Sequence, residues 1–306
     1  HKVGQKIVVV SSGAIALGAR RLGLEKGGRA SLADAQASAS VGQILLSGIW
    51  AELLGAQGLN AAQMLVTLDD LEDRRRYLNI TATLDRLLGA GAVPVINEND
   101  SVATEEIRFG DNDRLAARVA QAAGAHGVVL LSDVDGLYDR DPKDPEAQLV
   151  PEVSKVDGRI RIMVTGDSSS GMGSGGMASK LDAADIATRA GIGLAIASGL
   201  REHPLAALEN GAPCSWFAPR EGASARKSWI GGRLSVKGSI SVDAGAAKAL
   251  RGGASLLPAG ATVVAGAFKR GDVIDILTTE GETLARGLSE YDAADAAQIC
   301  GKRSGE

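Results

Sequence analysis

The sequence predicts an α/β fold with a mainly parallel central sheet covered by helices, followed by a small β-rich domain. Five short aliphatic runs recur between residues 7 and 197, and each ends in small polar residues. The runs are apolar throughout rather than alternating, which is typical of strands buried on both faces and so of parallel sheets. Near residue 226 the pattern changes to short strand-like segments separated by glycine turns.

The first domain is built from these runs and the segments between them. The predicted strands are residues 7–10, 64–66, 93–96, 128–131 and 194–197. Alanine-rich segments between them predict helices, for example at residues 74–88 and 181–190. Ligands bind beyond the carboxyl ends of parallel strands, which is where the serines, asparagines and aspartates of this chain fall. The polar residues of one such loop can equally well cap the next helix, but several such loops at one edge of the sheet favour a binding site.

The second domain begins after an irregular boundary. Residues 201–226 contain Pro204, Pro213 and Pro219, which predicts a linker without regular structure. We therefore predict a first domain over residues 1–226, linker included, and a second over residues 227–306. In the second we expect strands at residues 239–243, 262–264, 272–277 and 283–288, with one helix at residues 244–250. From residue 226 onward, 11 Lys and Arg stand against 9 Asp and Glu, so its basic bias is slight.

The composition is that of a globular protein from a reducing compartment. Hydrophobic residues make up 45%, charged residues 23%, and the formal charge of -4 excludes neither an anionic substrate nor a nucleic acid. Cys214 and Cys300 lie far apart, so neither a disulfide framework nor a zinc site is implied. No apolar run approaches the roughly 20 residues that span a bilayer, and the N-terminus is not a signal peptide. We expect a cytoplasmic protein that does not contact a membrane.

Residues 93–120 hold the densest polar groups of the first domain. A short buried strand runs into one cluster, and a helix begins in a second; the clusters are Asn97, Glu98, Asn99, Asp100 and Gly110, Asp111, Asn112, Asp113. Such groups are costly to desolvate unless they bind each other, a helix end or a ligand. A binding site is therefore the first hypothesis for this stretch.

A glycine-dense stretch, residues 168–180, reads SSSGMGSGGMASK. It is not a dinucleotide fingerprint, because no buried strand precedes it, nor a Walker phosphate loop, because Leu181 follows Lys180. Its glycines still let backbone N–H groups approach phosphate oxygens, and the following helix start and Lys180 add positive charge. The alternative is a flexible surface linker. A shorter turn of the same kind, with hydroxyl groups and a glycine before a helix, is formed by Ser11, Ser12 and Gly13; it either binds an anion or only caps the helix.

Residues 132–142 carry four aspartates after a buried strand. The stretch lacks the ligand spacing of a calcium loop. Two interpretations remain: a nucleotide pocket with Tyr138 against the base, or a solvated acidic turn. His1, His126 and His203 are scattered, and histidine general-base chemistry is not expected. Phosphoryl transfer to an ionised carboxylate needs no histidine, because the protein only aligns the nucleophile and neutralises charge.

Four motifs in order resemble the amino acid kinase family, and within it the glutamate 5-kinases: VPVINEND, FGDNDRLAA, LLSDVDGLYDRDP and GMGSGGMASKLDAA. The tail from about residue 226 resembles the PUA domain of those enzymes. The resemblance implies an amino-acid-kinase-like sandwich and ATP-dependent phosphorylation of the L-glutamate γ-carboxylate to L-glutamyl 5-phosphate, the first step of proline synthesis. It further implies Mg²⁺, feedback inhibition by proline and a homo-oligomer, dimer or tetramer. The alternatives are a related amino acid kinase, or an RNA-binding or regulatory protein acting through the PUA domain.

The resemblance also implies roles for individual residues by position. Glutamate would be bound by Ser12, Asn97, Asp100, Asp111 and Asn112. ATP would be held by Ser132, Asp133, Ser174, Gly175, Gly176, Met177, Ala178, Ser179 and Lys180. Lys180 would stabilise charge on the transferred phosphoryl group, and Asp113 would organise the lysines and the metal-bound nucleotide.

The start of the chain departs from the family pattern. Family members begin with another strand that carries a lysine, followed by a Gly-Ser or Gly-Thr loop, whereas here an apolar strand follows His1 almost at once. The tail also stops sooner than is usual. On this basis we expect a truncated chain that binds its substrates poorly and turns over little.

Overall fold

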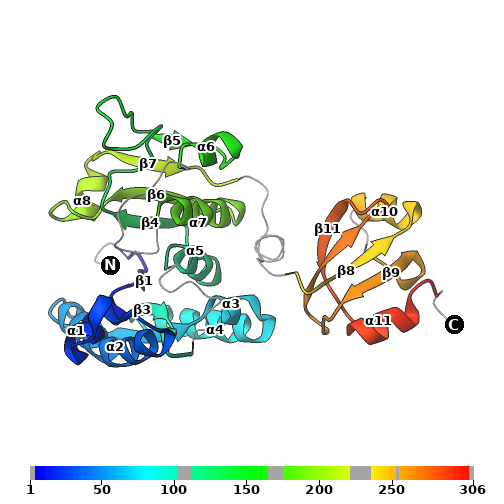
Figure 1. The fold of residues 1–306 in the computed structure, drawn as a ribbon, viewed down its shortest axis with the longest axis horizontal. Helices are drawn as coiled ribbons and strands as arrows, with labels where there is room; N and C mark the ends of the chain where they lie inside the picture. Colours follow the sequence, from blue (N-terminus) through cyan, green and yellow to red (C-terminus); the bar gives the residue numbers. More distant parts are fainter. Residues whose placement is uncertain (1–3, 103–111, 165–175, 221–235, 253–254, 303–306) are drawn as a thin grey trace. The chain divides into compact units, whose positions relative to one another are not determined.

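The computed structural model describes residues 4–102, 112–164, 176–220, 236–252 and 255–302 (Figure 1). The chain divides into two compact units, His1–Ala223 and Ser224–Glu306. Each unit encloses its own buried aliphatic clusters, two large ones in the first unit and one in the second.

The first unit contains two sheets, with strand orders β1-β3-β2 and β4-β6-β7-β5. The strands are β1 (Val9–Val10), β2 (Ala61–Val66), β3 (Val93–Glu98), β4 (Gly127–Ser132), β5 (Glu152–Val153), β6 (Gly193–Ser198) and β7 (Cys214–Phe217). All neighbours pair in parallel except β6 and β7, which are antiparallel. Every residue of β3 and of β6 is buried, as their continuous apolar runs predict. The expected mainly parallel α/β fold is confirmed.

The helices of this unit are α1 (Ala14–Leu22), α2 (Leu32–Gly55), α3 (Leu68–Glu72), α4 (Arg74–Gly89), α5 (Asn112–Ala122), α6 (Gly158–Ile162), α7 (Met177–Arg189) and α8 (Pro204–Glu209). Two 3₁₀ turns, Glu25–Gly28 and Asp100–Val102, lie before α2 and after β3. Helix α5 contacts β1 and β3 of one sheet, β4 of the other, and α7 (Figure 1). The start of α5 is therefore positioned by both halves of the unit.

Helices α1 and α2 pack closely through two glycines. A Cβ on Gly18 would lie 1.8 Å from the main-chain oxygen of Ser38, and one on Gly42 would lie 1.7 Å from that of Ala14. Any side chain at either position would push the helices apart. This contact fixes the turn before α1, which carries Ser12.

Helix α2 qualifies the expectation that no segment is apolar enough to span a bilayer. Its 24 residues include a window with a mean hydropathy of 1.3, so by length and composition alone it passes as a candidate span. One such helix close to the N-terminus is weak support for a membrane segment. Its close packing on α1 shows that part of it belongs to the core of the unit.

The segment expected to be an irregular linker, residues 201–226, is more regular than its prolines suggest. Pro204 occupies the first turn of α8, where its missing N–H costs nothing, and Pro213 immediately precedes β7. Strand β7 pairs with β6 and β5, and its Phe217 is fully buried. The interpretation of residues 201–217 as linker is therefore wrong. Conversely, the strand expected at residues 7–10 is only Val9–Val10.

In its described residues, the second unit is a four-stranded sheet of order β11-β10-β8-β9 with two helices. Its elements are β8 (Gly238–Val242), α10 (Ala244–Arg251), a 3₁₀ turn (Pro258–Gly260), β9 (Ala261–Gly266), β10 (Val273–Leu277), β11 (Thr283–Leu288) and α11 (Ala293–Ile299). Its core includes Val242, Phe268 and Ile274. The expected strands and the expected helix at residues 244–250 all appear, and α11 is an addition.

Candidate functional site

The carboxyl end of β3 brings the predicted residues together. Because β1 and β3 are parallel, their carboxyl ends meet, and the main-chain N–H of Ser11 donates to the oxygen of Ile96 at 2.9 Å. This register places the turn at Ser12 beside Asn97, although 85 positions separate them in the chain. Helix α5 begins at the same place with Asn112.

Asn112 is the centre of an amide network at this edge. Its Nδ2 lies 2.7 Å from Oγ of Ser12, 3.0 Å from Oδ1 of Asn97 and 3.1 Å from the main-chain oxygen of Ser11. Asn97 in turn donates from Nδ2 to Oε1 of Gln43 on α2 at 2.9 Å. The network therefore joins the turn before α1 to α2, β3 and α5. Within the described chain, Oδ1 of Asn112 is buried and has no hydrogen-bond partner.

Asp100 lies just beyond β3 and is buried. Burial raises the pKa of its carboxyl to about 6, and the nearby Arg29 guanidinium opposes that shift. Its Oδ1 has no hydrogen-bond partner among the described residues. Buried carboxylates without partners are costly, so this side chain is suited to a cationic ligand.

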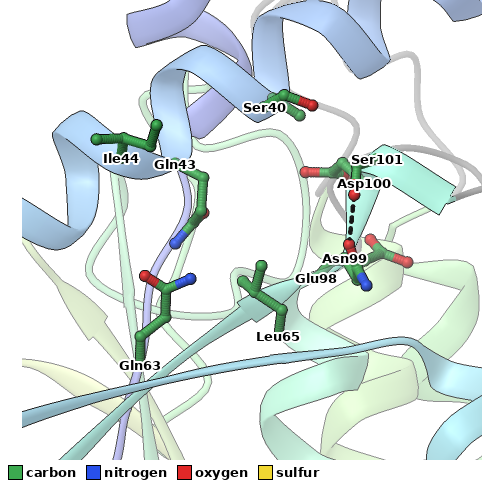
Figure 2. A pocket seen from close by; sticks show the side chains of 10 residues that line it. Ser40, Gln43, Ile44, Gln63, Leu65, Glu98, Asn99, Asp100 and Ser101 are labelled. Atoms are coloured by element: carbon green, nitrogen blue, oxygen red, sulfur yellow. Dashed lines mark hydrogen bonds between the residues drawn. The ribbon is translucent and has the colours of Figure 1, made fainter.

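Two cavities meet at Asp100. The smaller, of about 50 Å³, is lined by Ser12, Asn97, Asp100 and Asn112, together with Glu98, Arg29 and residues 13–16 at the start of α1. The larger, of about 280 Å³, lies between α2 and the ends of β2 and β3. Figure 2 shows Gln43 and Gln63 facing one another on one side of the larger cavity and the Asn99 to Ser101 turn on the other. The larger cavity lacks Ser12, Asn97 and Asn112, so the smaller one matches the predicted amino acid site.

Lys180 and Asp113 form the ion pair of the site. Nζ of Lys180, from the first turn of α7, lies 2.9 Å from Oδ2 of Asp113, the second residue of α5. The two side chains are only 11% and 18% exposed. Because Asp113 follows Asn112 directly, this pair lies next to the amide network. Both predicted catalytic residues are thus brought together.

The predicted nucleotide side is more open. Ser132 ends β4, is half-buried, and its Oγ donates to Oδ1 of the exposed Asp133 at 3.1 Å. Parallel pairing of β4 with β6 puts Ser132 next to Ser198. Gly176 precedes α7, and Met177, Ala178, Ser179 and Lys180 form its first turn, so their N–H groups lie at the positive end of a 13-residue helix.

The other aspartates of residues 132–142 have local structural partners. Asp135 pairs with Arg201 at 2.8 Å. Oδ1 of Asp139 accepts from the N–H of Gln148, and Oδ1 of Asp141 from that of Lys143, both at 2.9 Å. These contacts fit the acidic-turn alternative for this part of the stretch and leave Asp133 as its candidate for ligand binding.

Some predicted residues lie outside the described part of the chain: Asp111, Ser174 and Gly175. The described ranges contain no group of three or more His, Cys, Asp or Glu side chains placed to hold a metal ion.

Comparison with known proteins shows the family to which the chain belongs. A sequence model of the amino acid kinase family matches residues 1–198, and one of the PUA domain matches residues 238–306. A glutamate 5-kinase of Novosphingobium aromaticivorans is 65% identical over 99% of this chain and 80% of the relative. The chain belongs to the glutamate 5-kinase family. The glutamate 5-kinase of Zymomonas mobilis is 62% identical over the whole chain and 77% of the relative.

Among solved structures, carbamate kinase from Giardia lamblia bound to AMP-PNP is similar, with 18% identity and a TM-score of 0.49. The match covers 72% of this chain and 85% of that one.

Two residues of the candidate site could not be picked out from the sequence. Gln43 anchors Asn97 from 54 positions away, and nothing in its alanine-rich surroundings distinguishes it. Arg29 lines the smaller cavity from the turn between α1 and α2. Its only local signal is that it follows Gly27 and Gly28, which is a weak indication of a tight turn.

Proposed function

We propose that this protein transfers the γ-phosphoryl group of ATP to the γ-carboxylate of L-glutamate, giving L-glutamyl 5-phosphate and ADP. The observation that carries the proposal is the Lys180 to Asp113 ion pair, which lies at the start of α5 directly beside the amide network of Asn112. A cation held next to an amino acid cavity is the arrangement that phosphoryl transfer between two anions requires.

The amino acid side supplies acceptors for an ammonium group. Oδ1 of Asp100 and Oδ1 of Asn112 are both buried and unpartnered within the described residues, and both residues line the same cavity. An ammonium group brings three donors and a positive charge, so it satisfies both acceptors. Ser12 and Asn97 hold Asn112 in place, and we propose that Asp111 completes this side.

The chemical step needs no proton transfer from the protein. An oxygen of the ionised γ-carboxylate attacks the γ-phosphorus of ATP, and the new O–P bond forms as the bond from that phosphorus to the β,γ-bridging oxygen breaks, releasing ADP. Lys180 neutralises charge on the transferred group as it moves between the two oxygens. Asp113 acts through Lys180 by fixing the position of its ammonium group.

We propose that the first turn of α7 and the end of β4 hold ATP. The N–H groups of residues 176–178 suit phosphate oxygens, whereas those of Ser179 and Lys180 donate to the oxygen of Gly176. Ser132 and Asp133 suit the nucleoside end. Ser174 and Gly175 extend the phosphate-binding segment in this proposal. The described residues offer no cage for Mg²⁺, so we propose that the ion arrives on the phosphates of ATP, which is how Mg²⁺ is usually held.

Self-association is supported by the surface of α2. Ile44, Ile49 and Leu53 are 77%, 45% and 57% exposed on this one helix of the isolated chain. Large apolar side chains gathered on one element are typical of interaction surfaces. We propose a homo-oligomer, dimer or tetramer, that works in the cytoplasm and is inhibited by proline.

Hydroxamate formation tests the proposal. The purified protein is incubated with ATP, Mg²⁺, hydroxylamine and each of glutamate, aspartate and acetylglutamate, and both hydroxamate and ADP are measured. We expect product with glutamate only. Product with another acid indicates a related kinase instead.

RNA binding through the PUA unit is the alternative function. Two of its arginines, Arg270 and Arg286, already pair with Glu290 and Asp275, which reduces the basic surface available to RNA. Salt-dependent retention of RNA without any glutamate-dependent ADP release would favour that alternative.

A further inference from the structure

The smaller cavity carries charges of both signs. The carboxylates of Glu98 and Asp100 line it, and the guanidinium of Arg29 is the one cationic group among its lining residues. The head group of an α-amino acid also carries one charge of each sign. The acceptors on Asp100 and Asn112 account for its ammonium group but not for its α-carboxylate.

Arg29 is held at this cavity by a tightly packed turn. Lys26, Gly27 and Gly28 have φ values of 50°, 62° and 73°, so three successive residues adopt the left-handed region. A Cβ on Gly28 would lie 2.3 Å from Oγ of Ser38 and 2.7 Å from Cβ of Ala19. Gly28 therefore seats the turn against α1 and α2, and the N–H of Arg29 then donates to the oxygen of Lys26 at 3.3 Å.

The side chain of Arg29 remains available for a ligand. It is exposed, and within the described residues it forms no salt bridge, although it is close enough to Asp100 to act on the pKa of that carboxyl. Arg20 and Arg21 differ: they lie in the last turn of α1, where they complement the helix dipole, and neither lines the cavity.

We infer that Arg29 binds the α-carboxylate of the amino acid substrate and so selects α-amino acids over simple carboxylates. The inference rests on the proposed glutamate kinase activity and adds to it a specificity-determining residue. In this arrangement the head group of glutamate occupies the cavity, with its ammonium group at Asp100 and Asn112 and its α-carboxylate at Arg29. Its side chain extends out of the cavity, so that the γ-carboxylate can reach the phosphoryl group. A guanidinium suits this task because it presents paired donors to both carboxylate oxygens.

The test compares Arg29→Ala with the parent protein on two substrates. Glutamate carries the α-carboxylate, and 4-aminobutyrate is the same molecule without it. For glutamate we expect kcat/KM to fall roughly tenfold to hundredfold, because a charge-assisted contact is lost, with the KM for ATP unchanged. For 4-aminobutyrate we expect low turnover by the parent protein and no further change in kcat/KM in Arg29→Ala. Arg29→Lys should recover part of the loss.

Arg20→Ala is the matched control, since it removes an exposed arginine from the neighbouring helix end. An equal loss with both substrates in Arg29→Ala means a structural role and overturns the inference, as does unchanged kcat/KM for glutamate. Failure of the proposed function itself is distinct, because the parent protein would then show no glutamate-dependent ADP release.

Discussion

The two sides of the site differ in how far the protein alone determines them. On the amino acid side, Asn112, Asn97 and Gln43 form a continuous chain of hydrogen bonds that joins three elements. On the proposed nucleotide side, the described residues include a hydrogen bond from the half-buried Ser132 to the exposed Asp133. From this chain of hydrogen bonds we infer that the proposed amino acid side is preorganised, and we expect the nucleotide to contribute part of the order on its own proposed side.

The Lys180 to Asp113 pair connects the two proposed sides, because Lys180 belongs to α7, the helix of the proposed nucleotide segment, and Asp113 follows Asn112. Removal of this ion pair is therefore expected to have the largest effect on catalysis. For Lys180→Ala we expect kcat to fall on the order of a hundredfold to a thousandfold, with smaller changes in either KM. Asp113→Ala should also lower turnover more than affinity.

The matched control is Asp182→Ala. Asp182 lies on α7, the same helix as Lys180, and forms an exposed ion pair with Arg161 of α6. Exposed pairs contribute little, so this variant should keep the parent kcat. Steady-state ADP release, with thermal unfolding to confirm folding, checks all three variants. Parent-like turnover in Lys180→Ala would remove the basis for the proposed step.

A smaller expected effect is a pH dependence of the KM for glutamate that the KM for ATP does not share. Burial raises the pKa of Asp100 to about 6, so the carboxyl becomes neutral as pH falls through that value and loses its attraction for an ammonium group. We expect the KM for glutamate to rise about tenfold between pH 7 and pH 5, while the KM for ATP stays nearly constant. The γ-carboxyl of glutamate, with a pKa of about 4.3, remains mostly ionised in this window.

Asp100→Asn should bind glutamate weakly and should lose the pH dependence. The pKa of Asp100 is higher in the folded than in the unfolded protein, which is the opposite of a salt-bridged aspartate. The free energy of unfolding therefore falls as pH rises from about 4 through 6 and the buried carboxyl becomes charged. Substrate-free Asp100→Asn should therefore unfold at a higher temperature than the parent at pH 7. A lower unfolding temperature there would show that Asp100 has a stabilising partner.

Much of this could be predicted from the sequence where the signal is local. The buried strands, the polar residues after them, and the helix that begins near Lys180 are each marked by a few neighbouring residues. The amide network could not be predicted, because Gln43 meets Asn97 only through the fold. Strand β7 was missed because the prolines around it normally indicate a loop, although here they lie at element ends. Arg29 lacks any pattern of its own.

The most direct test of the two-sided site is the pair of Michaelis constants, for glutamate and for ATP, measured in Asn112→Ala and Ser132→Ala. Asn112→Ala removes the centre of the amide network, and Ser132→Ala removes the hydroxyl that contacts Asp133. We expect Asn112→Ala to raise the KM for glutamate about tenfold and Ser132→Ala to raise the KM for ATP by roughly threefold to fivefold, each leaving the other constant unchanged. Equal increases in both constants for either variant would contradict the division of the site.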